Sequence, residues 1–135
     1  MVTAVDSSAL IDVLTNDRDH GAASLQALRT AAAVGPLIVC PIVWAELRGI
    51  FEDPERMTHA FAEANIQFDP FDRECADLAG QHWREYRRRG GSRERLIADF
   101  FIGAHAQTRG GRLIARDRGF YRRYFEGLQI LNGRN

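Results

Sequence analysis

Residues 2–14, VTAVDSSALIDVL, decide how the fold begins. The first four of these residues form a β-prone run, an acid follows at Asp6, and apolar residues then recur at helical spacing as far as Leu14. Ser7 or Ser8 can cap that helix, because a serine hydroxyl accepts a hydrogen bond from a free backbone N–H at a helix start. The stretch therefore predicts a strand, an acidic turn and a helix.

Short apolar runs alternate with helical segments along the rest of the chain. We expect strands at residues 2–5, 37–40, 66–68, 112–115 and 128–131. We expect further helices over residues 21–33, 42–51, 54–64 and 72–89, and through Asp99 to Gly110. This alternation predicts an α/β fold with a short, mainly parallel β-sheet flanked by helices.

The composition fits one domain over residues 1–135, since the chain is long enough for one core and too short for two. Its apolar fraction is 45%, and no apolar run approaches the roughly 20 residues that a membrane helix needs. The first residues lack the basic and apolar segments of a signal peptide. We therefore expect a cytoplasmic protein without a membrane segment, in which Cys40 and Cys75 are buried thiols.

Charge is divided unevenly along the chain, although the formal net charge is zero. Residues 1–80 contain five arginines and thirteen acids, whereas residues 81–135 contain thirteen arginines and five acids. The second part is a candidate anion-binding face. Every Lys or Arg position is arginine, which excludes mechanisms that need a catalytic lysine.

Four acids stand in apolar surroundings. Asp99 is the only charged residue of residues 97–104, IADFFIGA, and Asp6, Glu46 and Asp117 each follow or interrupt an apolar run. Burying an unpaired carboxylate costs several kcal/mol or more. Ligands of parallel sheets bind at the carboxyl ends of the strands, where these acids can meet. The sequence thus predicts one acidic site.

Oxygen ligands without histidine or cysteine favour Mg²⁺ or Mn²⁺ over zinc. Such an ion supports phosphoryl transfer, because it polarises the phosphate and lowers the pKa of a bound water. We expect the small residues Gly103 and Ala106 to leave space beside Asp99. Each acid also has a structural alternative: Asp6 as a helix cap, Asp117 as a turn residue, and Glu46 and Asp99 as partners of buried arginines.

Four motifs together resemble the PIN-domain ribonucleases, and especially the VapC-type toxins of bacterial type II toxin–antitoxin systems. The motifs are residues 5–12 (VDSSALID), 44–47 (WAEL), 95–106 (RLIADFFIGAHA) and 113–120 (LIARDRGF). They extend over essentially the whole chain. Ala115 and Gly119 depart from the family pattern, since some members have a hydroxyl residue and a further acid there.

The resemblance implies a single PIN-like domain and a metal-dependent endoribonuclease that hydrolyses RNA phosphodiester bonds with metal-activated water. Asp6, Glu46, Asp99 and Asp117 would be the catalytic and metal-binding residues for Mg²⁺ or Mn²⁺, with Ser8 supporting the first aspartate. The implied partners are an RNA substrate, a cognate antitoxin protein and a second copy of the chain.

Arginines beside the motif acids are candidates for binding RNA phosphates, which suit bidentate guanidinium groups. They are Arg93, Arg95, Arg116 and Arg118. The four histidines show no ligand spacing, so we expect each to be a surface or core residue.

Three other functions stay open. The chain could be a catalytically silent PIN-fold module that binds RNA or protein. A phosphatase or phospho-acceptor domain is disfavoured, because those families use an essential lysine. DNA could replace RNA, since metal-assisted hydrolysis at phosphorus does not need a 2′-hydroxyl.

Overall fold

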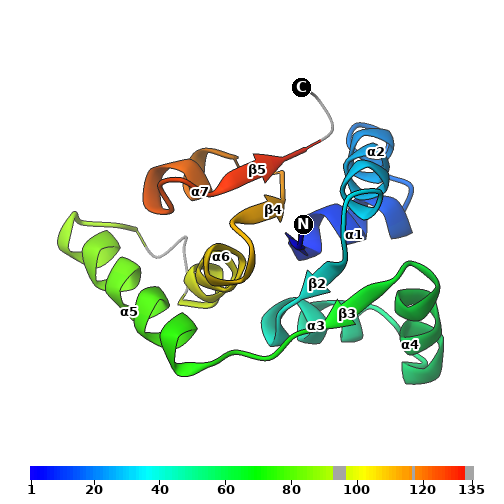
Figure 1. The fold of residues 1–135 in the computed structure, drawn as a ribbon, viewed down its shortest axis with the longest axis horizontal. Helices are drawn as coiled ribbons and strands as arrows, with labels where there is room; N and C mark the ends of the chain where they lie inside the picture. The colour runs from blue at the N-terminus through cyan, green and yellow to red at the C-terminus, as the bar shows by residue number, and fades with distance from the viewer. Residues whose placement is uncertain (93–96, 117, 133–135) are drawn as a thin grey trace.

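The computed structural model describes residues 1–92, 97–116 and 118–132 (Figure 1). The elements follow in the order β1 (Thr3–Val5), α1 (Ser7–Leu14), α2 (Gly21–Ala32), β2 (Leu37–Val39), α3 (Pro41–Arg48), α4 (Pro54–Glu63), β3 (Ile66–Phe68), α5 (Arg73–Arg88), α6 (Ile97–Arg109), β4 (Arg112–Ile114), α7 (Arg118–Tyr124) and β5 (Gln129–Leu131). Among the described residues, no helix is both long and apolar enough to span a membrane.

The strands form one sheet in the order β3-β2-β1-β4-β5, and each neighbouring pair is parallel. In the centre of the sheet, Ala4 pairs with both Ile38 and Leu113. Beyond the end of β1, the Asp6 N–H donates to the Ile114 carbonyl at 2.9 Å. The predicted α/β fold and the five predicted strands are confirmed, and the carboxyl ends of β1 and β4 lie side by side.

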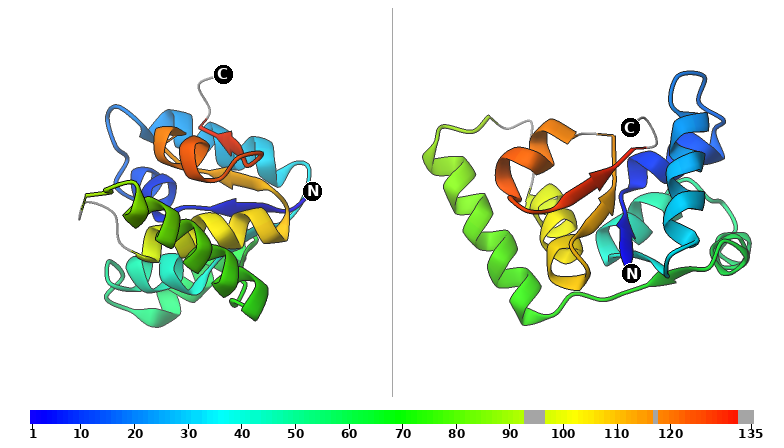
Figure 2. Two further views of the ribbon diagram at one scale, coloured as in Figure 1. Left: turned by 90° about the vertical axis from the view of Figure 1, so that its left-hand side faces the viewer. Right: turned by 45° about the horizontal axis from the view of Figure 1, so that its top comes forward.

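Helices lie on both sides of the strands. In Figure 1, α5 and α6 are on the left of the sheet, whereas α1, α2 and α4 are on the right. Both Figure 1 and the right-hand view of Figure 2 show α6 between α5 and the strands. This position explains why the run around Asp99 is so apolar, because a helix covered on two sides buries most of its surface.

Aromatic side chains fill the space between α5, α6 and α7. Phe100 is fully buried, and the rings around it are Trp83, Tyr86, Phe120, Tyr124 and Phe125. A Cβ at Gly103 would collide with the ring of Phe125. The expectation that Gly103 leaves space for an ion beside Asp99 is therefore wrong, because Phe125 occupies that space.

Two further details differ from the sequence analysis. The helix α7 was not predicted, because its sequence RGFYRRY is short and gives no clear apolar period. The N-cap of α1 is Asp6, which was the structural alternative for that residue, and its carboxylate accepts from the Ser7 N–H. The expectation that Ser7 or Ser8 caps this helix is wrong. Asp6, the acid of the turn after β1, therefore caps the helix that follows it.

We expect Gly103→Ala to lower the free energy of unfolding by about 1–3 kcal/mol, because the buried Phe125 ring would have to move. Gly80→Ala is the matched control, since no atom lies within 4 Å of its added Cβ in the middle of α5. That change should raise the free energy of unfolding by about 0.5–1 kcal/mol. Denaturant unfolding measures both, and effects of the same sign would contradict the packing of Gly103.

Candidate active site

Asp6 lies between β1 and α1, at the carboxyl edge of the sheet. Its backbone is extended, with φ −78° and ψ 152°, so that its side chain turns back over the start of α1. One carboxylate oxygen, Oδ1, accepts from the Ser7 N–H at 2.8 Å, and Oδ2 accepts from the Ser8 hydroxyl at 3.1 Å. Ser8 thus contacts Asp6 in the way that the family resemblance implied.

Glu46 reaches the same edge from the middle of α3 and is exposed. The hydroxyl of Ser7 donates to Glu46 Oε1 at 3.2 Å and lies 3.5 Å from Asp6 Oδ1. Ser7 therefore bridges the two acids. The sequence suggests Ser7 only as a possible helix cap, although two hydroxyl residues directly after an acid are a signal that both contact the carboxylate.

Asp99 lies in the first turn of α6 and is half-buried. Its charge raises the pKa of both Asp6 and Glu46, so three acids from three elements face one region. The structure thus brings together Asp6, Glu46 and Asp99, which are far apart in the sequence.

The electrostatics of this cluster disfavour ionisation. Burial is the largest cause that raises the pKa of Asp6 from 3.8 to about 6, and the charges of Glu46 and Asp99 add to it. Hydrogen bonds from Ser8 and Ser7 oppose the shift. Burial also raises the pKa of Glu46, with Asp99 as the neighbouring charge. Like charges held together in a partly dry site favour a bound cation or proton.

The chemistry of these side chains fits a hard divalent cation, because all the ligands are carboxylate oxygens. In the described part of the chain, no three His, Cys, Asp or Glu side chains are close enough to hold a metal ion together. Mg²⁺ tolerates such an arrangement, since it keeps several waters and often binds through one or two carboxylates. Asp6 and Asp99 are the residues that would hold it, with the exposed Glu46 as their neighbour.

The remaining predicted site residues are one acid and four arginines. Asp117, Arg93 and Arg95 are outside the described residues, and Arg118 begins α7. Arg116 makes an ion pair with Asp12, with 3.1 Å between Nε and Oδ2.

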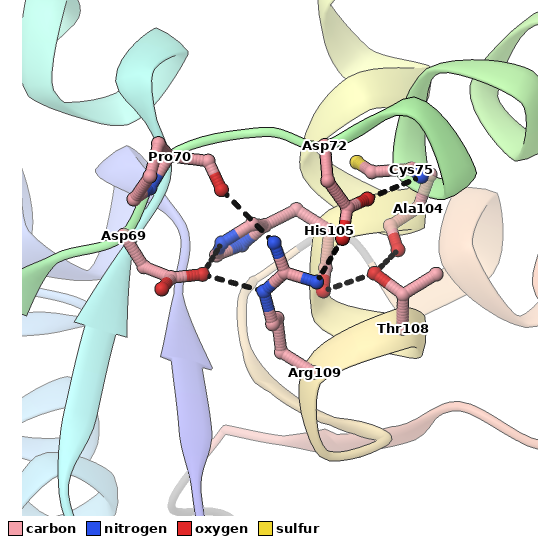
Figure 3. Close-up of polar contacts among 8 residues, drawn as sticks. All are labelled: Asp69, Pro70, Asp72, Cys75, Ala104, His105, Thr108 and Arg109. Atoms are coloured by element: carbon pink, nitrogen blue, oxygen red, sulfur yellow. Dashed lines mark hydrogen bonds and ion pairs between the residues drawn. The ribbon is translucent and has the colours of Figure 1, made fainter.

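A second polar network joins the segment after β3 to the C-terminal half of α6 (Figure 3). His105 is 1% exposed, and its Nε2 lies 2.7 Å from Asp69 Oδ2. Arg109 donates to Asp69 through Nε at 2.7 Å and to Asp72 through Nη1 at 3.0 Å. The expectation that each histidine is a surface or core residue is confirmed for His105, which is a core residue with a hydrogen-bond partner.

This network is electrostatically favourable, unlike the acidic cluster. Burial alone would raise the pKa of Asp69, but hydrogen bonds from Arg109 and His105 hold it below its ordinary value. Burial lowers the pKa of His105, although Asp69 opposes that shift. The neutral imidazole therefore donates its Nε2–H to Asp69, and α6 is fixed to the sheet edge.

The raised pKa of Asp6 predicts how stability depends on pH. Since the folded state binds this proton more tightly than the unfolded chain, the stabilisation is complete below pH 3.8 and is lost as pH rises through about 6. The metal-free protein should lose about 2–3 kcal/mol from this group over that interval. Asp6→Asn should remove the step and be more stable than the wild type near neutral pH. Denaturant unfolding across pH tests this, and parallel curves for the two proteins would contradict it.

The PIN domain family model matches residues 3–126, which include β1 and the helices that bear Glu46 and Asp99. A search of curated protein sequences gives no match. The family match extends over all four motifs on which the resemblance was based, and it confirms that resemblance.

Solved structures with this fold include toxin–antitoxin complexes. VapBC2 from Rickettsia felis, bound to a promoter DNA fragment, gives a TM-score of 0.74 at 16% identity and covers 96% of this chain and 97% of that chain. DNA-bound VapBC from Salmonella typhimurium gives 0.71 at 21% identity, with 96% of both chains covered. VapC20 from Mycobacterium tuberculosis, a sarcin–ricin loop cleaving toxin, gives 0.57 at 18% identity and covers 94% of this chain and 98% of that one.

At these identities the solved structures establish the fold, while the family model covers most of the sequence. The parallel sheet, the acid after β1 and the acid in the first turn of α6 occur together within the matched residues. The chain belongs to the PIN domain family.

Proposed function

We propose that this protein is a metal-dependent endoribonuclease and the toxin component of a type II toxin–antitoxin pair acting in the cytoplasm. The observation that supports this best is the group formed by Asp6, Glu46 and Asp99. Three elements contribute these acids to one edge of the sheet. Burial raises the pKa of Asp6 and Glu46, and the charges of neighbouring acids raise both further. A purely structural role would have favoured paired acids, as in the Asp69 network.

The roles of the residues follow from their positions. Asp6 is the principal ligand of Mg²⁺ or Mn²⁺, because Ser7 and Ser8 fix the orientation of its carboxylate. Asp99 is a second ligand from α6. Glu46, which is exposed and contacts Ser7, orients the attacking water or accepts its proton. Asp117, which is outside the described residues, is the proposed fourth acid on the strength of the family resemblance alone. The bound ion supplies the positive charge that activates water and offsets charge on the leaving oxygen.

RNA is the proposed substrate on the strength of the likeness to VapC20 of Mycobacterium tuberculosis, whose description names cleavage of the sarcin–ricin loop. The chemistry of the acids alone would also serve DNA. Arg93, Arg95, Arg116 and Arg118 remain the proposed contacts for RNA phosphates.

A cognate antitoxin is the proposed partner, since the VapBC structures with this fold are toxin–antitoxin assemblies. An apolar groove between α1, α2 and α4 offers a surface for a helix of such a partner. Its side chains include Leu10, Val13, Leu14, Leu25, Leu28 and Phe61. Leu14 of this groove is 46% exposed and so is accessible to a partner. We also propose a homodimer, as the family resemblance implies.

The alternative function is a catalytically silent module that binds RNA or protein. Such a module does not need carboxylates that repel one another, so the raised pKa values of Asp6 and Glu46 favour the enzyme.

We expect the purified, antitoxin-free protein to cut RNA with Mg²⁺ or Mn²⁺ and to stop when a chelator is added. Asp6→Asn and Asp99→Asn should each lower the rate by about 10²-fold or more, because each removes a charged ligand. Asp77→Asn, an exposed acid of α5, is the matched control and should cut at the wild-type rate. The assay compares single-stranded RNA, structured RNA and DNA of the same sequence.

Two outcomes would contradict the proposal. Cleavage that survives the chelator and both substitutions would exclude this site as its source. Folded protein that binds RNA but cuts none of these substrates would favour the silent module.

A further inference from the structure

We propose that Asp12 is a positioning residue that holds the guanidinium of Arg116 ready to bind a phosphate of the RNA. This inference rests on the proposed function and extends it to a residue outside the acidic cluster. The geometry that supports it is a buried carboxylate in α1 that anchors one end of a surface arginine.

Asp12 is an acid that the core has to compensate. Its side chain is 2% exposed, and Oδ2 accepts from the Ser24 hydroxyl of α2 at 3.0 Å. The same oxygen lies 3.1 Å from Nε of Arg116. If Arg116 moved away, the buried carboxylate of Asp12 would lose its charged partner, which is unfavourable. The ion pair therefore stabilises this one position of the Arg116 side chain.

The pair lies beside the acidic cluster. Ser8 and Asp12 are four residues apart on α1, so their side chains occupy one face on successive turns. Ser8 donates to Asp6. On the other side, the Ile114 carbonyl accepts from the Asp6 N–H, and Arg116 follows Ile114 by two residues. The guanidinium is thus paired with a residue of α1 one turn along the helix from Ser8, which contacts Asp6.

Arg116 remains available for a second interaction. Its side chain is 44% exposed although its Nε is paired. A guanidinium has five N–H donors in a planar arrangement that matches two phosphate oxygens. Among the described residues, the ion pair with Asp12 involves Nε, so the two Nη groups are the donors that would meet a phosphate. An arginine already fixed by Asp12 loses little rotamer freedom when it binds, which favours affinity.

Because Asp12 is negatively charged, the direction in which Asp12→Asn changes the affinity for RNA tests this proposal. If only net charge mattered, Asp12→Asn would remove a negative charge near the RNA and tighten binding. If Asp12 orients Arg116, the same change weakens binding although the protein becomes more positive. If the Asp12–Arg116 ion pair only joins α1 to the segment after β4, Asp12→Asn lowers the stability of the protein and leaves RNA binding unchanged.

The experiment measures binding of a 5′-fluorescein-labelled single-stranded RNA of mixed sequence by fluorescence anisotropy. All variants are made on the Asp6→Asn parent, so that the RNA stays intact. Arg116→Gln and Asp12→Asn should each raise the dissociation constant about tenfold, the size expected for one charge-assisted contact. The double variant should bind no more weakly than Arg116→Gln alone, because Asp12 acts through Arg116.

Controls separate orientation from charge and from folding. Arg56→Gln removes an exposed arginine of α4 and should change the dissociation constant less than twofold. Arg116→Lys keeps the charge but not the fork of donors, so it should bind nearly as weakly as Arg116→Gln. Thermal unfolding of each variant shows whether it is folded at the assay temperature. With an active Asp6, Asp12→Asn should raise KM and leave kcat nearly unchanged.

Asp12→Asn that is folded and binds the RNA as tightly as the parent, or more tightly, would overturn the inference. Additive losses in the double variant would also overturn it. A parent that binds no RNA would instead refute the proposed function, and this inference with it.

Discussion

The repulsion between carboxylates gathered at one edge of a parallel sheet is the constraint on which the site depends. The fold creates this repulsion, because the carboxyl ends of β1 and β4 lie together and α3 and α6 approach the same edge. Two neutral donors, the Ser7 N–H and the Ser8 hydroxyl, partly offset this repulsion, because each donates a hydrogen bond to the Asp6 carboxylate. Burial is the largest cause that keeps the pKa of Asp6 at about 6, and the neighbouring charges add to it, so the compensation by the protein alone is incomplete. The remaining negative charge is what a divalent cation would neutralise.

The position of Asp99 depends on the rest of α6 being held firmly. Phe100 anchors the helix among aromatic rings, and Gly103 lets Phe125 pack directly on its backbone. Farther along, His105 and Arg109 join the helix to Asp69. The first turn of α6 can therefore present a carboxylate in unfavourable surroundings, because the remaining turns contribute the stability that this turn lacks.

The sequence predicted the strands and the meeting of Asp6, Glu46 and Asp99, because apolar periodicity and the ends of parallel strands are local features. It did not predict α7, whose apolar residues pack against α5 and α6 and so depend on tertiary contacts. For the same reason, the partner of Gly103 could not be predicted.

Long-range contacts between side chains could not be predicted from the sequence either. Asp12 reads as an ordinary polar residue of an amphipathic helix, yet it is buried against Arg116, which lies more than a hundred residues later. The exposure of Glu46 was not expected either, since its neighbours in the sequence are apolar. Local patterns indicate which residue types are present but not which long-range contacts they make.

The arrangement of the helices gives the uneven charge of the chain a direction in space. Acids dominate the part of the sequence that forms α1, α2 and α4, while arginines dominate the part that forms most of α5, α6 and α7. Much of the arginine excess belongs to α7 and the last turns of α5, which lie on one side of the strands (Figure 1), so the charge of a neutral molecule is uneven across its sheet. In the field of a polyanion such a molecule turns its arginine-rich side inward before any contact forms. This orienting torque weakens as added salt shortens the screening length.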